Sequence, residues 1–203
     1  MTTDDHLVRI TVGDVRPLDG PVTLVEYDPA WPERYAALSR VIREALGDAV
    51  VLLEHVGSTS VPGLVAKPII DIVLAVSDSA EELAYVKPLG AEGYVLRIRE
   101  PEWYEHRMLE NQAADVNLHV FTAGCPQIER MLLFRDLLRA DPAERDRYAA
   151  VKHRLAARRW RHVQNYADAK AAVVDEIMTA DGPTKPQLDR PASRRRGRAD
   201  HSP

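Results

Sequence analysis

Five apolar stretches in the middle of the chain predict the strands of one β-sheet. They cover residues 50–56, 69–76, 94–99, 106–110 and 116–121, and turn-forming or polar residues separate them. The last three follow one another closely enough for an antiparallel meander beside the first two. A further short strand is predicted over residues 22–27.

Helical periodicity surrounds these stretches. The segment Trp31-Pro-Glu33 opens a helix with an apolar face at positions 35, 38, 42 and 46, and Gly47 ends it. A second helix is predicted over residues 79–89, with Ser79 as its cap. From Pro126 onward, three segments with apolar faces predict a helical C-terminal third, the last covering residues 165–179. The predicted fold class is therefore α+β: a small mixed, largely antiparallel sheet with packed helices and a helical C-terminal third.

The two ends of the chain lack this periodicity. Residues 1–20 contain turn-forming pairs and no clear apolar face, so we predict an N-terminal extension. Residues 181–203 are polar, basic and rich in proline, so we predict a disordered tail. One domain over residues 21–180 remains.

Composition narrows the functional class. A chain of 203 residues with 45% hydrophobic content is sufficient for one domain with its own core. No apolar run reaches the roughly 18 residues that a membrane span needs, and the polar start is unlike a secretory signal. A single cysteine fits a reducing cytoplasm. The net charge of −4 is not that of a nucleic-acid-binding surface.

The stretch from His55 to Asp71 carries the clearest chemical signal. It joins two apolar strands through Gly57-Ser-Thr-Ser60, a turn whose hydroxyls and N–H groups suit phosphate oxygens. Asp71 then lies within the apolar run 69–76. An ionised carboxylate is costly to bury without a partner, so Asp71 must meet a cation or face a solvated cleft.

This stretch resembles the GrpB family, whose core reads very much as His55-Val-Gly-Ser-Thr-Ser-Val-Pro-Gly63 followed by Ala66-Lys-Pro-Ile-Ile-Asp71. The family resembles an outlying branch of the nucleotidyltransferase superfamily, in which a Gly-Ser turn precedes a strand that bears aspartate. The resemblance implies transfer of a nucleotidyl or related phosphorylated group to a small acceptor. A nucleotide or phosphorylated small molecule is the implied partner. No membrane and no specific nucleic acid is expected.

The chain departs from the superfamily at the metal site. The usual Asp-x-Asp places two carboxylates on one strand face, whereas here Val73 follows Asp71 at that spacing. The best further candidate is His119, which shares a face with Asn117 on the strand 116–121. We expect Asp71 and His119 to be catalytic or to hold a divalent metal. One carboxylate with one imidazole suits a transition metal better than magnesium. A catalytically degenerate binding module, or a module that assists folding, is the alternative.

Basic residues and a second histidine complete the predicted site. Arg135 and Arg139 lie i, i+4 on one helix within Phe134-Arg-Asp-Leu-Leu-Arg139, which again resembles the GrpB pattern, and can clamp anionic oxygens. A salt bridge through Asp136 or Glu144 is the competing interpretation of Arg135. The predicted substrate- and phosphate-binding residues are Gly57, Ser58, Thr59, Ser60, Lys67, Arg97, His106, Arg107, Arg135 and Lys152.

Overall fold

A five-stranded mixed sheet forms the centre of the computed structural model, which describes residues 2–180. Its strands are β1 (Leu52–Val56), β2 (Ile70–Val76), β3 (Tyr94–Glu100), β4 (His106–Asn111) and β5 (Val116–Thr122). The order across the sheet is β1-β2-β5-β4-β3, and only β2 and β5 run parallel. The predicted meander β3-β4-β5 and the predicted α+β fold class are both confirmed.

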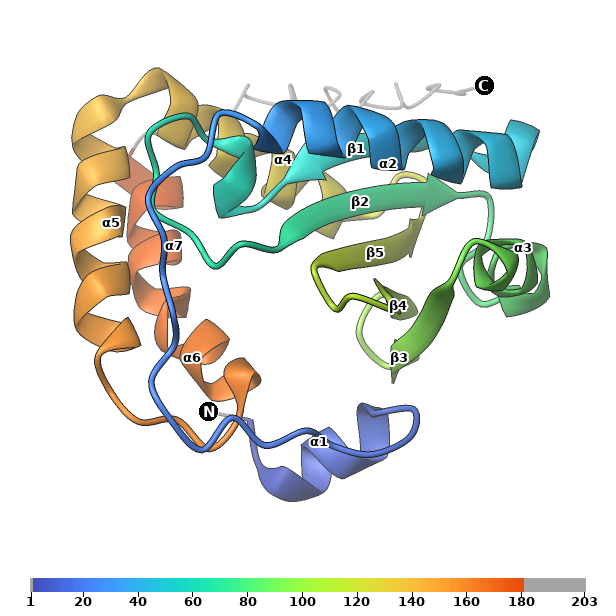
Figure 1. Cartoon of the computed structure of the whole chain (residues 1–203), viewed down its shortest axis with the longest axis horizontal. Coiled ribbons are helices and arrows are strands. Elements are labelled where there is room, and N and C mark those ends of the chain that lie inside the picture. The colour runs from blue at the N-terminus through green and yellow to red at the C-terminus, as the bar shows by residue number, and fades with distance from the viewer. Residues whose placement is uncertain (1, 181–203) are drawn as a thin grey trace, which may run out of the picture.

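One face of the sheet carries the main hydrophobic core. Helices α2 (Trp31–Leu46) and α3 (Val86–Ala91) pack there (Figure 1). Side chains that alternate along the strands, such as Ile72, Leu74 and Leu118, are fully buried against them. Because alternate strand residues point to opposite faces, Asp71, Asn117 and His119 project from the other face.

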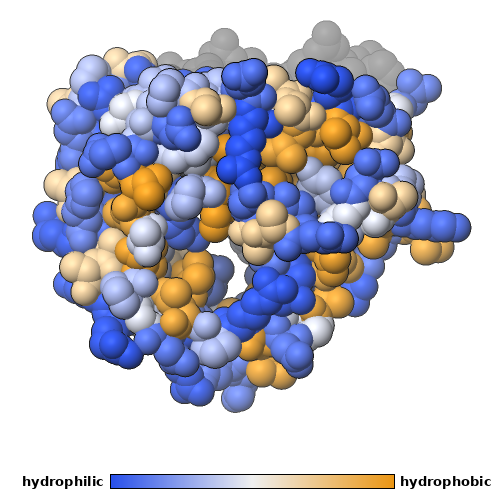
Figure 2. Space-filling view, viewed as in Figure 1, coloured by the Kyte–Doolittle hydropathy of each residue, from blue (hydrophilic) through white to orange (hydrophobic). Residues whose placement is uncertain are grey.

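The other face is only partly covered. Helix α4 (Pro126–Ala140) packs on it around Val73 and Phe121. Helices α5 (Pro142–Ala156), α6 (Val163–Ala169) and α7 (Ala171–Ala180) then stand beside the sheet, as Figure 1 shows. In the same view, Figure 2 shows a hollow in the surface of the lower half of the molecule. The sheet and the C-terminal helices thus form the two sides of a cleft.

The N-terminal extension contains a helix that the sequence pattern does not predict. Helix α1 (Asp4–Ile10) is capped by the Thr3 side chain and buries Leu7 and Ile10. The segment that follows donates from Val12 N to Arg97 O on β3 (2.8 Å). A seven-residue helix that buries only two apolar side chains, three positions apart, has too little periodicity to be identified from sequence.

Three further predictions of secondary structure are corrected. Residues 22–27 form no strand, and only Val25 pairs, in an isolated bridge to Ala66. The helix predicted over residues 79–89 is instead a 3-10 turn, η3 (Glu82–Ala84), followed by α3. The Ser79 hydroxyl donates to Glu105 O (3.0 Å) and caps no helix. The helix predicted over residues 165–179 is divided at Lys170 into α6 and α7.

Two further 3-10 turns complete the described elements, η1 (Gly47–Ala49) and η2 (Ser58–Ser60). The tail predicted over residues 181–203 lies outside the described residues. Among residues 2–180, no helix combines the length and the hydropathy that crossing a membrane requires.

Candidate functional site

Asp71 is the centre of the site, and the pairing of β2 with β5 fixes its neighbours. The parallel register places Asn117 beside Asp71, and Asn117 Nδ2 donates to Asp71 Oδ1 (2.8 Å). His119 Nε2 lies 3.9 Å from the same oxygen. Burial raises the pKa of Asp71, but His119, Lys67 and Asn117 together lower it below its ordinary value. The carboxylate is therefore ionised at neutral pH.

Gly57 allows the backbone to pass directly beside this carboxylate. A Cβ at position 57 would lie 2.4 Å from Asp71 Oδ2, well inside van der Waals contact. The residue also has a φ of +68°, which side-chain-bearing residues rarely adopt. Glycine is thus required here on two independent grounds, and the turn after β1 is held against Asp71.

Three lysines from separate segments face Asp71. Lys67 precedes β2, Lys152 belongs to α5, and Lys170 lies between α6 and α7. Burial lowers the pKa of each amine and the charge of Asp71 raises it; for Lys152 the pKa falls to about 7. The charge of Lys170 further lowers the pKa of both other lysines. One carboxylate therefore faces three amines, and the local charge favours an anionic ligand.

Lys152 is the most deeply buried of these amines. Its side chain is 2% exposed, Nζ donates to Val65 O, and the ammonium lies 5.5 Å from the centre of the Tyr148 ring. Tyr148 is one helical turn earlier on α5, and the charge of Asp71 adds to burial in raising its pKa. We refer to Asp71, Asn117, His119, Ser58, Lys67, Tyr148, Lys152 and Lys170 as the Asp71 cluster.

The sequence pattern identifies Lys67 and Lys152 but not Lys170. Lys170 lies inside a segment whose apolar periodicity predicts one unbroken helix, so nothing in the pattern marks it as a break that faces a cleft. Its ammonium lies 4.5 Å from the centre of the Tyr166 ring, which fixes its direction.

Only the first hydroxyl of the predicted phosphate turn belongs to the cluster. Thr59 and Ser60 are 1% and 4% exposed. Thr59 Oγ1 donates to Ile69 O (3.2 Å) and bonds with His55 Nε2 (3.0 Å), while Ser60 Oγ donates to Gly57 O (2.6 Å). These two hydroxyls hold the turn together, whereas the Ser58 hydroxyl lies with the Asp71 cluster, and the phosphate contact of the turn stays a prediction.

Glu100 and His106 form a series of hydrogen bonds that ends at His119, on its side away from the cleft. Glu100 Oε2 is 2.7 Å from His106 Nδ1, and His106 Nε2 is 3.1 Å from His119 Nδ1. His106 is 5% exposed, and burial lowers its pKa to about 4 despite Glu100, so its ring is neutral at pH 7. His106 thus supports His119 from the interior, and it does not face the cleft as a phosphate contact.

The hydrogen-bond partners of His106 and His119 determine which nitrogen of each ring carries the proton. The Glu100 carboxylate can only accept, so His106 carries its proton on Nδ1 and leaves Nε2 as an acceptor. His119 then donates from Nδ1 to His106 Nε2, and its Nε2 faces Asp71 and the cleft. Nε2 is therefore the ring nitrogen of His119 that a ligand in the cleft can reach.

The three predicted arginine contacts lie elsewhere. Arg97 bonds to Asp14 O (3.2 Å) and lies 3.4 Å from Glu110. Arg107 is paired in register with Val120, a residue of the α2/α3 face, so it projects away from the Asp71 cluster. Arg135 bonds to Glu54 and Asp136, as the competing salt-bridge interpretation expects. Asp136 is a partner that the sequence predicts, whereas Glu110 and Glu54 are not predicted because they lie on other strands.

Glu82 is the carboxylate that satisfies buried Arg107. Its Oε1 accepts from Arg107 Nε (2.5 Å) and from Arg99 Nε (2.6 Å), and the hydrogen bond from Arg99 is the main cause that lowers the pKa of Glu82 to about 2. We expect Glu82→Gln to lower the free energy of unfolding at pH 7 by about 1–3 kcal/mol.

The pH dependence of this contribution has a definite sign. A depressed carboxylate pKa stabilises the fold above the unfolded value of 4.5 and is lost as the pH falls toward 2. Urea unfolding at pH 7 and pH 3 should therefore show a smaller difference between wild type and Glu82→Gln at pH 3. The exposed neighbour variant Glu81→Gln is the control, and equal stability of the two variants at pH 7 would contradict the prediction.

The donor set does not fit magnesium. Val73, two positions after Asp71 on β2, is fully buried against Phe121. No group of three or more His, Cys, Asp or Glu side chains able to hold a metal occurs among residues 2–180. Magnesium needs several oxygen ligands, and Asp71 supplies the single carboxylate of the cluster.

Comparisons with known proteins identify the family. The model of the GrpB protein family matches residues 21–180. The UPF0157 protein BH1888 of Halalkalibacterium halodurans is 54% identical over 176 residues, which cover 87% of this chain and 90% of that protein. The crystal structure of conserved protein GrpB from Enterococcus faecalis has a TM-score of 0.66 and 28% identity, and the match covers 78% of this chain and 96% of that one. A crystal structure of the Cid1 poly(U) polymerase has a TM-score of 0.48 and 18% identity, with 66% and 42% of the two chains covered. The chain belongs to the GrpB family.

Proposed function

We propose that this chain binds a nucleoside triphosphate in the Asp71 cluster and transfers a nucleotidyl or related phosphorylated group to a small acceptor. The observation that carries the proposal is the convergence of Lys67, Lys152 and Lys170 on one carboxylate beside the Ser58 turn. Three partly or fully buried amines facing one carboxylate leave an excess of positive charge that a polyphosphate would neutralise. The resemblance of the Gly-Ser turn and Asp-bearing strand to nucleotidyltransferases supplies the reaction class.

The residues of the cluster divide the chemistry between them. Ser58 and the lysines bind the phosphate oxygens and stabilise the negative charge of the departing pyrophosphate. His119 Nε2 accepts the proton of an acceptor hydroxyl, whose oxygen forms a bond to the α-phosphorus. The bond from that phosphorus to the pyrophosphate oxygen breaks, and the pyrophosphate leaves with the electron pair. Asp71 orients the hydroxyl and stabilises the imidazolium that forms.

Asp71 and His119 are also the two side chains that we propose for a transition-metal ion. A carboxylate oxygen and an imidazole nitrogen 3.9 Å apart can both reach one ion. The base role and the ligand role of His119 are alternatives, and thermal-shift titration with Zn²⁺ and Mn²⁺, with and without nucleotide, separates them. Metal-dependent stabilisation that Asp71→Asn abolishes supports the ligand role.

Nucleotide binding without turnover is the second candidate function. The buried Val73 in place of a second acid favours it, because the superfamily's metal-assisted step lacks a ligand there. Under this proposal the lysines and Ser58 keep their roles and His119 binds ligand only.

Label transfer distinguishes the two functions. The full chain is incubated with an α-³²P-labelled nucleoside triphosphate and a small-molecule extract of the source cells, and binding is measured in parallel by calorimetry. Transfer predicts a new labelled compound and an equal amount of pyrophosphate, both lost in Asp71→Asn. Saturable binding without any labelled product would overturn transfer in favour of binding alone. Absence of saturable binding by any of the four common triphosphates would overturn both functions.

A further inference from the structure

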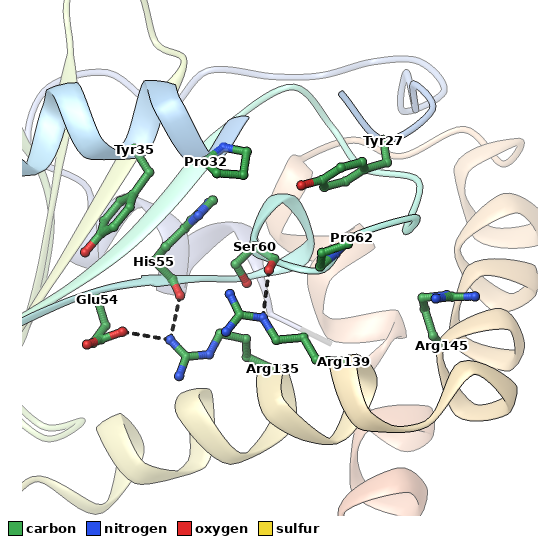
Figure 3. Close-up of a pocket in the computed structure, with 10 residues that line it drawn as sticks. All are labelled: Tyr27, Pro32, Tyr35, Glu54, His55, Ser60, Pro62, Arg135, Arg139 and Arg145. Atoms are coloured by element: carbon green, nitrogen blue, oxygen red, sulfur yellow. Dashed lines mark hydrogen bonds and ion pairs between the residues drawn. The ribbon is translucent and has the colours of Figure 1, made fainter. Parts of the chain in front are cut away.

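A second cavity lies apart from the Asp71 cluster, on the side of the η2 turn where Arg135 and Arg139 project. Its volume is about 450 Å³, within the usual size range of small-molecule sites. Its walls come from the start of α2, from β1, from η2 and from α4 and α5 (Figure 3). It is lined by Tyr27, Pro32, Tyr35, Glu54, His55, Ser60, Pro62, Arg135, Arg139 and Arg145. No residue of the Asp71 cluster lines it.

The arginines of this cavity differ in how many hydrogen bonds their guanidinium N–H groups make. Arg135 Nη1 donates to Glu54 Oε2 (2.9 Å) and His55 O (3.0 Å), so Arg135 is neutralised within the wall. Arg139 donates from Nε to Ser60 O (2.9 Å), and its contact with Asp136, at 3.6 Å, is longer than a hydrogen bond. Among the described residues, its two Nη groups therefore make no hydrogen bond.

Arg145 adds a third guanidinium from α5, at the end of the cavity away from Glu54 and beyond Pro62 (Figure 3). Its carboxylate partner is Asp146, whose side chain is 71% exposed and which does not line the cavity. Glu54 is the single carboxylate of the lining, and Arg135 already binds it. The cavity consequently holds an excess of positive charge at Arg139 and Arg145.

The remaining lining is uncharged and flat. The Tyr35 ring stacks on His55 with centroids 4.8 Å apart and planes 13° apart. Burial lowers the pKa of His55 to about 4, so the imidazole carries no charge at pH 7. Tyr27, Pro32 and Pro62 complete this part of the wall, and Figure 3 shows Tyr27 and Pro32 across the cavity from Arg139. Such a surface suits a planar or short apolar group.

We propose that this cavity is a separate binding site for a small organic anion, a carboxylate or phosphate carried on a planar group. The anionic oxygens bind the Nη groups of Arg139, because a guanidinium matches either head group with paired hydrogen bonds, and Arg145 adds positive charge further along the cavity. The planar group packs against Tyr27, Pro32 and Pro62. The site does not depend on the proposed triphosphate chemistry, since none of its residues is shared.

Phenyl phosphate and benzoate are the probes, and neutral benzyl alcohol is the matched control. Binding to the full chain is followed by calorimetry and by NMR. We expect saturable binding of at least one anion, little or no binding of benzyl alcohol, a rise in Kd of about 10-fold in Arg139→Ala and a rise of about 3-fold in Arg145→Ala. Arg139→Lys should restore part of the affinity. The comparison of the two anions shows which head group the site prefers.

Two control variants make the result decisive. Arg154→Ala removes an exposed arginine of the same helix α5 and should leave Kd within about 2-fold. Lys170→Met removes a cation of the Asp71 cluster and should also leave it unchanged. Weakening by Lys170→Met but not by Arg145→Ala would place the anion at the Asp71 cluster and overturn the proposal, as would the absence of saturable binding below about 20 mM. Arg145 makes no hydrogen bond to the η2 turn among the described residues, so Arg145→Ala remains a valid test if Arg139→Ala unfolds.

Discussion

Replacing Lys152 with methionine is expected to weaken nucleoside triphosphate binding by about 100-fold and, at the same time, to make the protein more stable. The amine is 2% exposed and faces the site where we propose the phosphates bind. A charge-assisted hydrogen bond to phosphate is lost, which weakens binding. In the free protein a buried cation is also lost, and methionine has a similar length without the desolvation cost. Calorimetric titration and urea unfolding measure the two effects separately.

The pH dependence makes this prediction sharper. Unfolded lysine keeps its proton up to about its ordinary pKa of 10.5, whereas folded Lys152 keeps it only below about 7. The unfolded chain therefore binds more protons in that window, and wild-type stability rises with pH across it. The stability advantage of Lys152→Met should be on the order of 4 kcal/mol at pH 7 and should vanish above pH 10.5.

Binding of a polyphosphate should raise the pKa of Lys152 again. A bound polyphosphate favours the charged amine, so the wild type should take up nearly one proton on binding at pH 8.5, as measured by calorimetry in buffers of different ionisation enthalpy. Lys152→Met should take up less. The control is Lys87→Met, on the exposed side of α3, which should alter neither affinity nor proton uptake. Unchanged affinity in Lys152→Met would remove Lys152 from the site.

The sheet could be predicted from sequence because its strands are the most apolar runs of the chain. Buried strands such as β2 and β5 can be recognised from their own apolar residues. The short turns between β3, β4 and β5 limit the pairing of these three strands to a meander. Helix α1 and the break at Lys170 could not be predicted, because both depend on packing between segments far apart in sequence. Thr2 N, for example, bonds to Asp168.

The site was predictable to the extent that its residues lie on regular elements. Asp71 and His119 lie on adjacent strands, so strand periodicity alone places both on the open face. The hydroxyls of the Ser58–Ser60 turn are different, because the direction of each is set by partners such as Ile69 O that a pattern does not contain. Arg135 shows the same limit, since its partner Glu54 is 81 residues away.

Replacing His119 with glutamine is expected to lower the rate of group transfer by about 10²–10⁴-fold with little change in triphosphate affinity. Glutamine retains size and hydrogen bonding, but it cannot accept a proton at neutral pH. Single-turnover rates and calorimetry on the same samples test this. Loss of triphosphate affinity in proportion to the rate would show that His119 binds the phosphates instead.

Glu100 and His106 are expected to act on the reaction only through His119. Glu100→Gln can present an N–H to His106 Nδ1, which would move the His106 proton to Nε2 and leave His119 Nδ1 to accept. The proton of His119 would then lie on Nε2, and the base facing the cleft would be lost. ¹⁵N NMR of the two rings reads these tautomers without any turnover: we expect protonated Nδ1 in both rings of the wild type and protonated Nε2 in both rings of Glu100→Gln. The transfer rate should fall about 10- to 100-fold in the variant. A His119 ring that bonded with solvent instead would not follow the tautomer of His106. An Nε2-protonated His119 in the wild type would therefore show that the hydrogen bonds from Glu100 through His106 do not determine which nitrogen of His119 is the base.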